Sequence, residues 1–326
     1  MPRRERASPS ATTGGATNAA SRPGRIVWRS HMTAVEDRIL HLPCWSGTVE
    51  TEPLQGGITN RNFLVRDRVG QFVVRVGGDI PIHGVMRFNE LAASRAAHAA
   101  DLSPEVVYAE PGVMVLRFIE GRTLTPEDVR ERSMLSRILP LLKRCHHDVA
   151  KHLRGPVLAF SPFHVIRDYG ATLGAAMGRR SNELSRLTEV AARLEREVGP
   201  FRPVFAHNDM LAANFLDDGD RLWLIDWEYG GFGSELFDLG GVAANNRLRS
   251  EDETWLLEGY FARRVDDELR RRYTAMKCAA ALREALWGLV SEIHSAVDYD
   301  FVGYSDACFE TFEDALAKFQ RDWNSQ

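Results

Sequence analysis

The sequence predicts an α+β fold in which an antiparallel β-sheet with one helix precedes a larger, mostly helical part. Short segments rich in β-branched residues, separated by glycine-bearing turns, fill the stretch before residue 120. From Thr125 onward, apolar residues recur at helical spacing. A chain of 326 residues has room for two domains of ordinary size. We therefore expect a leader at 1–31, a first lobe at 32–120 and a second at 121–326.

The leader differs from the rest of the chain in composition. Residues 1–30 are rich in small residues and hold six arginines against one acid, Glu5. We expect disorder, because so few large apolar side chains cannot offset the entropy of ordering. The segment lacks the apolar stretch of a secretory signal. An organellar transit peptide is one interpretation; translation from Met32, with a translated leader before it, is the one we favour.

The body of the chain is acidic. Without residues 1–30, 35 of the 41 basic and 44 of the 45 acidic residues remain, which gives a net charge of −9. This charge argues against a nucleic-acid partner. No run reaches the roughly 18 apolar residues that span a membrane. The four cysteines form no CxxC pair, and we expect them to be reduced thiols in a cytoplasmic protein. We expect a monomer or a homodimer.

The first lobe contains five predicted strands and one helix. Strands are expected at 48–54, 61–65, 71–76, 105–108 and 113–119, and the helix at 87–100. Gly56 and Gly57 lie in the first turn, followed by Thr59 and Asn60. A plain hairpin turn is the ordinary interpretation of this glycine pair. The alternative is a loop whose backbone N–H groups face nucleotide phosphates.

One short stretch carries the chemistry. Asp209 follows His207-Asn208, Asn214 comes five residues later, and Asp226 ends an apolar strand after an Asp-Asp-Gly-Asp turn. A turn and a helix cap are the ordinary interpretation of an Asp and an Asn in one loop. The order also matches the polar residues of the protein-kinase pattern, which serve phosphoryl transfer from ATP. It predicts Asp209 as the base and Asn214 and Asp226 as ligands of Mg²⁺.

Earlier residues fit the same pattern by position. Arg75 stands on the third strand, where a kinase carries its phosphate-binding lysine, and Glu90 on the next helix is its expected partner. The alternative is an exposed strand arginine. Phe118 and Ile119 are expected at the hinge between the lobes, where backbone groups would bind the adenine.

The second lobe is predicted from helix signals. Thr125-Pro126 begins a helix, Pro140 interrupts an apolar stripe, and further helices are expected at 183–198 and over most of 252–323. Asp238 is interpreted as an anchor for backbone amides, and 228–233 as a flexible loop. His146, His147 and His152 suggest a metal site by proximity, but we interpret them as surface or interface residues because no ligand pattern accompanies them.

These residues resemble the choline/ethanolamine kinase branch of the aminoglycoside phosphotransferase-like family, of bacterial type. The segments that carry the resemblance are the loop at 54–63, the run from His207 to Asn214, Ile225-Asp226-Trp227-Glu228-Tyr229 with the following Phe237-Asp238-Leu239, and Trp287-Gly288-Leu289. The resemblance implies a protein kinase-like two-lobed fold and an ATP- and Mg²⁺-dependent kinase of small alcohols. It also implies that Glu228 supports the metal site.

The sequence departs from the pattern of this family among the residues that are expected to bind the substrate. Tyr229, Trp287 and Tyr304 are the expected aromatic residues there. Val290 stands where eukaryotic choline kinases have a second tryptophan, and Asn245 stands at about the place of an acid. A weaker cation cage leaves ethanolamine, another amino alcohol, thiamine or a sugar-like alcohol open beside choline.

Two further functions compete with a choline-type kinase. An aminoglycoside kinase would use an acidic cleft, which Asp209, Asp226, Glu228 and Glu235 would supply, but Trp287 favours the choline branch. A non-catalytic nucleotide-binding pseudokinase would have lost a catalytic position. Asp209, Asn214 and Asp226 are all present, so we disfavour a pseudokinase.

Overall fold

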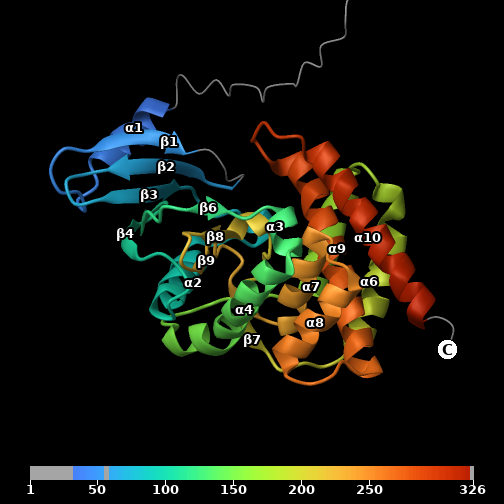
Figure 1. The fold of residues 1–326 in the computed structure, drawn as a ribbon. Helices are drawn as coiled ribbons and strands as arrows, with labels where there is room; N and C mark the ends of the chain where they lie inside the picture. The colour runs from blue at the N-terminus through green and yellow to red at the C-terminus, as the bar shows by residue number, and fades with distance from the viewer. Residues whose placement is uncertain (1–31, 55–58, 324–326) are drawn as a thin grey trace, which may run out of the picture.

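The computed structural model describes residues 32–54 and 59–323, and its two lobes are shown in Figure 1. The predictions for residues 1–31 and for Gly56 and Gly57 lie outside the described residues. The first lobe is built on a five-stranded antiparallel sheet of order β1-β2-β3-β5-β4. Its strands are β1 (Glu50–Leu54), β2 (Arg61–Arg66), β3 (Gln71–Val76), β4 (Val106–Glu110) and β5 (Val113–Arg117). The predicted sheet is confirmed.

Two helices flank this sheet, one more than the sequence predicts. α1 (Met32–Leu40) places Ile39 in a small core with the inward side chains of the strands. α2 (Arg87–Ala99) buries Ala93, Ala96 and Ala97 in the larger core of the second lobe. Alanines allow a close approach, and α2 lies between β4 and α4 (Figure 1). The helix that carries Glu90 is therefore fixed to both lobes.

The second lobe is mainly helical. Its helices are α3 (Pro126–Arg130), α4 (Arg132–His152), α5 (Pro162–Ala176), α6 (Leu184–Val198), α7 (Glu235–Asn246), α8 (Ser250–Phe261), α9 (Asp267–His294) and α10 (Phe301–Trp323). Short 3₁₀ helices are η1 (Pro81–His83), η2 (Ser181–Glu183) and η3 (Ala212–Asn214). α9 is buried along most of its length and packs against α5, α6, α7 and α10 (Figure 1).

Short strands carry the loops of the site. β6 (Arg122–Thr123) pairs with β8 (Phe215–Asp217), which forms a hairpin with β9 (Leu222–Leu224). β7 (Val204–Ala206) pairs with β10 (Gly231–Gly233). The expectation of a flexible loop at 228–233 is wrong for its last three residues, because their backbone is paired with β7.

Other helix predictions are confirmed, with one correction. Thr125 and Asp128 form the capping box that begins α3, and α6 ends before Gly199, whose φ is +63°. The surface interpretation of His146 is wrong: it faces the core of the lobe and is only 3% exposed. None of the described helices is long and apolar enough to cross a membrane.

Candidate active site

The loop after β7 is held by a buried carboxylate. Asp238, in the first turn of α7, accepts the backbone N–H groups of His207 (2.9 Å) and Asn208 (2.8 Å). Asn208 has a φ of +64°, a conformation that asparagine tolerates better than most residues. The anchoring role predicted for Asp238 is confirmed, and it fixes the backbone immediately before Asp209.

Two side chains join this loop to the segment around Asp226. The amide of Asn208 donates to the carbonyls of Ala206, Tyr229 and Gly231 at 3.0–3.3 Å. Nε2 of the His207 ring lies 2.9 Å from the carbonyl oxygen of Ile225. The two segments therefore form one unit, although about twenty residues separate them.

Asp209 is oriented by Asn214. The side-chain nitrogen of Asn214 donates to the backbone carbonyl and to Oδ2 of Asp209, both at 2.8 Å. Burial, and then the nearby Glu284 carboxylate, raise the pKa of Asp209 well above its usual range. A raised pKa makes the carboxylate a stronger base. Asp209 is thus a fixed carboxylate with enhanced basicity.

Three oxygen-bearing side chains converge beside it. The N–H of Ile225 donates to the backbone carbonyl of Asn214 (2.9 Å), which places Asp226 near Asn214. The positive φ of Asp226, +66°, is a strained conformation of the kind found at functional sites. The nitrogen of Asn214 is engaged by Asp209, so its amide oxygen is the atom that this side chain could offer to a metal ion. With Asp226 and Glu228, this all-oxygen donor set suits Mg²⁺.

Glu228 connects this set to the first lobe. Thr59 donates its hydroxyl to Oε2 of Glu228 at 2.8 Å, and the amide of Asn60 lies 3.5 Å from the same oxygen. Burial and the charge of Asp226 raise the pKa of Glu228 to about 7. The structure therefore brings Thr59 and Asn60 to the predicted metal residues.

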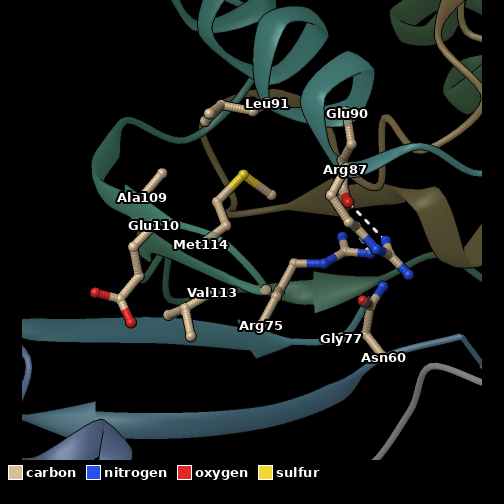
Figure 2. Close-up of a pocket in the computed structure, with 11 residues that line it drawn as sticks. Asn60, Arg75, Gly77, Arg87, Glu90, Leu91, Ala109, Glu110, Val113 and Met114 are labelled. Atoms are coloured by element: carbon tan, nitrogen blue, oxygen red, sulfur yellow. Dashed lines mark hydrogen bonds and ion pairs between the residues drawn. The ribbon is translucent and has the colours of Figure 1, made fainter. Parts of the chain in front are cut away.

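The predicted ion pair between Arg75 and Glu90 is present. Arg75 lies 3.2 Å from Oε1 of Glu90 and 2.7 Å from Oδ1 of Asp226, and its side chain is 10% exposed. The exposed-arginine alternative is therefore wrong. Figure 2 shows Arg87 and Arg75 both directed at Glu90. Arg87, which sequence reasoning missed, lies 2.6 Å from Oε2 of Glu90 and 3.5 Å from Glu228. Its position three residues before Glu90 on one helix was the available signal.

The predicted hinge leaves the sheet where expected. Phe118 and Ile119 are partly buried after β5, and the N–H of Phe118 donates to the carbonyl of Gln71 at 3.0 Å. That N–H is committed to the sheet and is not available to an adenine. Gly121 follows, where a Cβ atom would lie 2.5 Å from the carbonyl oxygen of Asp217. The connection between the lobes thus packs directly on β8.

The predicted substrate residues lie in or beside the pocket of Asp209. Trp287 donates its indole N–H to the hydroxyl of Tyr229 (3.0 Å), and its ring lies 5.7 Å from that of Tyr304. Asn245 donates to the carbonyl of Met210 at 3.4 Å. Asn245 also lines a pocket with Asp209. The structure thus brings Tyr229, Trp287 and Tyr304 together and places Asn245 beside Asp209.

Sequence reasoning missed two charged residues in this pocket. Arg283 and Glu284 come from α9 and line the pocket together with Asp209 and Asn245. The hydroxyl of Tyr304 donates to Oε1 of Glu284, and Arg283 donates to Oε2 at 2.9 Å. The signal was an Arg-Glu pair inside the otherwise apolar run at 278–290.

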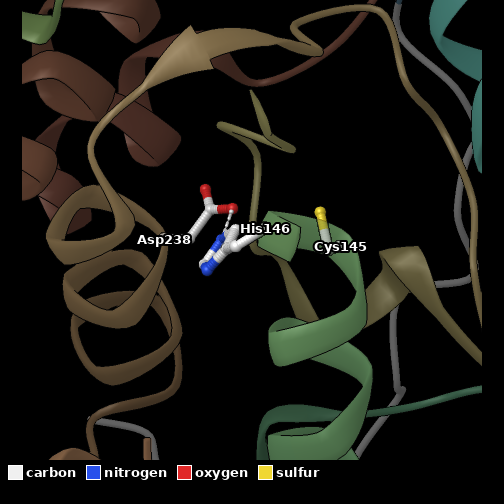
Figure 3. A group of neighbouring side chains, drawn as sticks. All are labelled: Cys145, His146 and Asp238. Carbon is white, nitrogen blue, oxygen red and sulfur yellow. Dashed lines mark hydrogen bonds and ion pairs between the residues drawn. The ribbon is translucent and has the colours of Figure 1, made fainter. Parts of the chain in front are cut away.

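Cys145, His146 and Asp238 form a compact group that resembles a metal site (Figure 3). Asp238 already accepts two backbone N–H groups and lies 2.9 Å from Nε2 of His146, whose Nδ1 lies 2.8 Å from the hydroxyl of Tyr260. Burial raises the pKa of the Cys145 thiol well above its usual range. These hydrogen bonds assign the His146 and Asp238 side chains a structural role in supporting the loop.

The fold and the loop are those of a kinase-like enzyme, in which a sheet lobe and a helical lobe meet where Arg75 contacts Asp226. The chain belongs to the choline/ethanolamine kinase family, whose model matches residues 51–248. It is therefore a small-molecule phosphotransferase, and the family implies ATP as phosphoryl donor.

Individual relatives agree with this placement. The chain is 28% identical to protein LicA of Haemophilus influenzae over 276 residues, 79% of each chain. It is 25% identical to a probable ethanolamine kinase of Arabidopsis thaliana over 286 residues, which cover 78% of this chain and 76% of that one. The crystal structure of a choline/ethanolamine kinase family protein from Mesorhizobium loti matches with a TM-score of 0.70 and 28% identity, covering 89% of this chain and 97% of the other. The predicted two-lobed kinase-like fold is confirmed.

Proposed function

We propose that this enzyme transfers the γ-phosphoryl group of ATP to the hydroxyl of choline or of a related amino alcohol such as ethanolamine. The observation that carries the proposal is the position of Asp209. Its carboxylate is held by Asn214, lines the pocket that contains Glu284, and lies next to the residues that suit Mg²⁺. The family and the names of its relatives support the choice of acceptor.

Asp209 acts as the base in this proposal. Its carboxylate accepts the proton of the acceptor hydroxyl as that oxygen attacks, and its raised pKa favours the transfer. Asp238 keeps the backbone of the loop in place, and Asn214 fixes the orientation of the carboxylate. The rate gain from these residues comes mainly from positioning.

The nucleotide side uses the remaining predicted residues. Asn214, Asp226 and Glu228 would hold Mg²⁺, and Arg75, oriented by Glu90, would bind phosphate oxygens. When bound, ATP supplies the phosphoryl group and Mg²⁺ neutralises the charge of its phosphates. The loop with Gly56, Gly57, Thr59 and Asn60 would bind the rest of the nucleotide together with the hinge at Phe118 and Ile119, through backbone groups of the hinge other than the Phe118 N–H. Residues 32–120 would then be the nucleotide lobe and 121–326 the acceptor lobe.

The test is ADP release by the purified protein with ATP and Mg²⁺. Choline, ethanolamine, thiamine and a set of aminoglycosides are compared as acceptors, with the acceptor-free rate subtracted. We expect stimulation by an amino alcohol. Stimulation by thiamine or an aminoglycoside alone would replace the proposed acceptor with the corresponding class. Silence across the panel would refute a choline or ethanolamine kinase.

A further inference from the structure

Arg87 connects separate segments of the candidate site through one guanidinium group. Nε donates to the carbonyl oxygen of Gly78 at 2.7 Å, Nη1 to Oε2 of Glu90 at 2.6 Å, and Nη2 to the carbonyl oxygen of Thr59 at 3.2 Å. Nη1 also lies 3.5 Å from Oε2 of Glu228. The side chain of Arg87 is 15% exposed. Because a guanidinium holds its donors in fixed directions, these contacts fix the four partners relative to one another.

The start of α2 holds Arg87 in place. Arg87 is the first residue of this helix, and its backbone N–H donates to Oδ1 of Asp79 at 2.7 Å. Two residues later, the buried Asn89 donates its amide to the carbonyl oxygen of Gly230 at 2.7 Å. Gly230 comes two residues after Glu228. The helix start that carries Arg87 is therefore attached to the segment of the second lobe that carries Glu228.

Thr59 is held from two sides. Its carbonyl oxygen accepts from Arg87, and its hydroxyl donates to Glu228 at 2.8 Å. Gly77, directly after β3, allows this close packing, because a Cβ atom there would lie 2.7 Å from Oδ1 of Asn60 and 3.4 Å from the carbonyl oxygen of Thr59. Arg87 thus fixes Thr59 at the point where the first lobe contacts a predicted metal residue.

Carboxylates outnumber cations in this cluster. Oε1 of Glu90 lies 3.2 Å from Arg75 and its Oε2 lies 2.6 Å from Arg87, so two arginines share one carboxylate. Arg75 also lies 2.7 Å from Asp226 and 3.9 Å from Glu228. Without Arg87, Arg75 would be the only cation that the described residues place within ion-pair distance of these three carboxylates. Their attraction would then hold Arg75 back from a phosphate group.

We infer that Arg87 is a positioning residue for the nucleotide, which acts by holding Thr59 and Glu90. Through Thr59 it orients Glu228, and through Glu90 it orients Arg75, the residue proposed to bind phosphate oxygens. Figure 2 shows the two arginines meeting at Glu90. The inference rests on the proposed function, because it names a residue that prepares the nucleotide side of the same site.

The experiment measures ATP binding with Mg²⁺ by calorimetry, without acceptor, and kcat and KM by ADP release with the best acceptor. Arg87→Met keeps much of the apolar stem and removes the guanidinium. It should weaken ATP binding and raise the KM of ATP by about 10- to 100-fold, as expected for a residue that orients the ligands of a metal site. The acceptor pocket is lined by other residues, among them Asp209 and Asn245. The KM of the acceptor should therefore stay within about twofold, and kcat should fall less than the KM of ATP rises.

Two further variants complete the test. Arg87→Lys keeps the charge but cannot hold the same acceptors in fixed directions, so it should recover only part of the loss, and it decides the matter if Arg87→Met does not fold. Arg95→Met, an exposed change on the same helix, should alter neither ATP binding nor kcat.

Two results would overturn the inference. One is a folded Arg87 variant with a lower unfolding midpoint but an unchanged KM of ATP, which is the behaviour of a purely structural arginine. The other is full wild-type ATP binding by Arg87→Lys. ADP release with either result would leave the proposed function standing, whereas weaker ATP binding by Arg87→Met without ADP release from any acceptor, even by the wild type, would refute only the proposed function.

Discussion

Replacing Asp238 by Asn should weaken both the fold and the reaction. The carboxylate is 1% exposed and accepts the N–H groups of His207 and Asn208. An asparagine oxygen can replace one acceptor only, so the amide nitrogen would face the other N–H group, donor to donor. His146 can adapt by changing its tautomer, since its second partner is the hydroxyl of Tyr260.

The loss in the free energy of unfolding can be estimated from these contacts. One buried N–H without a partner costs about 1–3 kcal/mol, and a second hydrogen bond loses the contribution of a charged acceptor, about 1 kcal/mol. Water cannot reach the site to compensate, so the free energy of unfolding should fall by about 3 kcal/mol. Asp209 follows Asn208 directly, and a displacement of about 1 Å would lower kcat by up to about 100-fold.

The assay is urea unfolding followed by circular dichroism, together with kcat under conditions where the variant is folded. Asp266→Asn is the matched control, because Asp266 is an exposed N-cap of α9 and asparagine caps a helix equally well. Its unfolding midpoint should not move. A change below about 0.5 kcal/mol for Asp238→Asn, within the range of ordinary surface substitutions, with unaltered kcat would refute the anchoring role.

Three other changes test separate parts of the structure. Asp226→Ala should weaken nucleotide binding only when Mg²⁺ is present, and calorimetry that shows unchanged magnesium dependence would argue against a ligand role. Burial, followed by the charge of Arg283, lowers the pKa of His83 from 6.5 to about 4. Between these values the unfolded chain binds a proton that the folded chain does not. The free energy of unfolding should therefore fall by up to about 3 kcal/mol as the pH drops through this window. His83→Asn should remove this share of the pH dependence, and an unchanged difference between pH 7 and pH 4 would contradict it. Gly121→Ala places a Cβ atom 2.5 Å from a backbone oxygen of β8 and should cost about 1–3 kcal/mol by overpacking. Gly78→Ala, with nothing within 4 Å, is its control, and equal melting temperatures would refute the close packing at the hinge.

Local sequence patterns were sufficient to predict most of the fold. The strands of the first lobe are short segments, most of which contain valine, separated by turn residues, and the capping box at Thr125 fixes a helix start with residues close in the chain. β10 was missed because two of its three residues are glycines, so its pairing with β7 depends on tertiary structure alone. α1 was missed as a short helix that is stabilised by packing Ile39 against the sheet.

The residues of the candidate site also fall into two groups: those that local sequence patterns predict and those that only the fold brings together. Asp209, Asn214 and Asp226 lie within a short stretch, and their spacing along the chain is enough to indicate phosphoryl transfer. The pairing of Arg75 with Glu90 could be predicted from the order of the third strand and the following helix along the chain. The hydrogen bonds of His146 to Asp238 and the approach of Arg283 to Tyr229 join residues many positions apart. No local periodicity records such contacts, so sequence reasoning placed His146 on the surface and did not include Arg283.

The measurement that tests the central claim most directly is the turnover of Asp209→Asn beside the wild type, with ATP, Mg²⁺ and the best acceptor. Because the isosteric amide cannot accept the hydroxyl proton, kcat should fall by about two or more orders of magnitude. ATP binding by calorimetry and the unfolding midpoint should stay close to those of the wild type. A variant that folds, binds ATP and keeps a kcat near that of the wild type would contradict the assignment of Asp209 as the base.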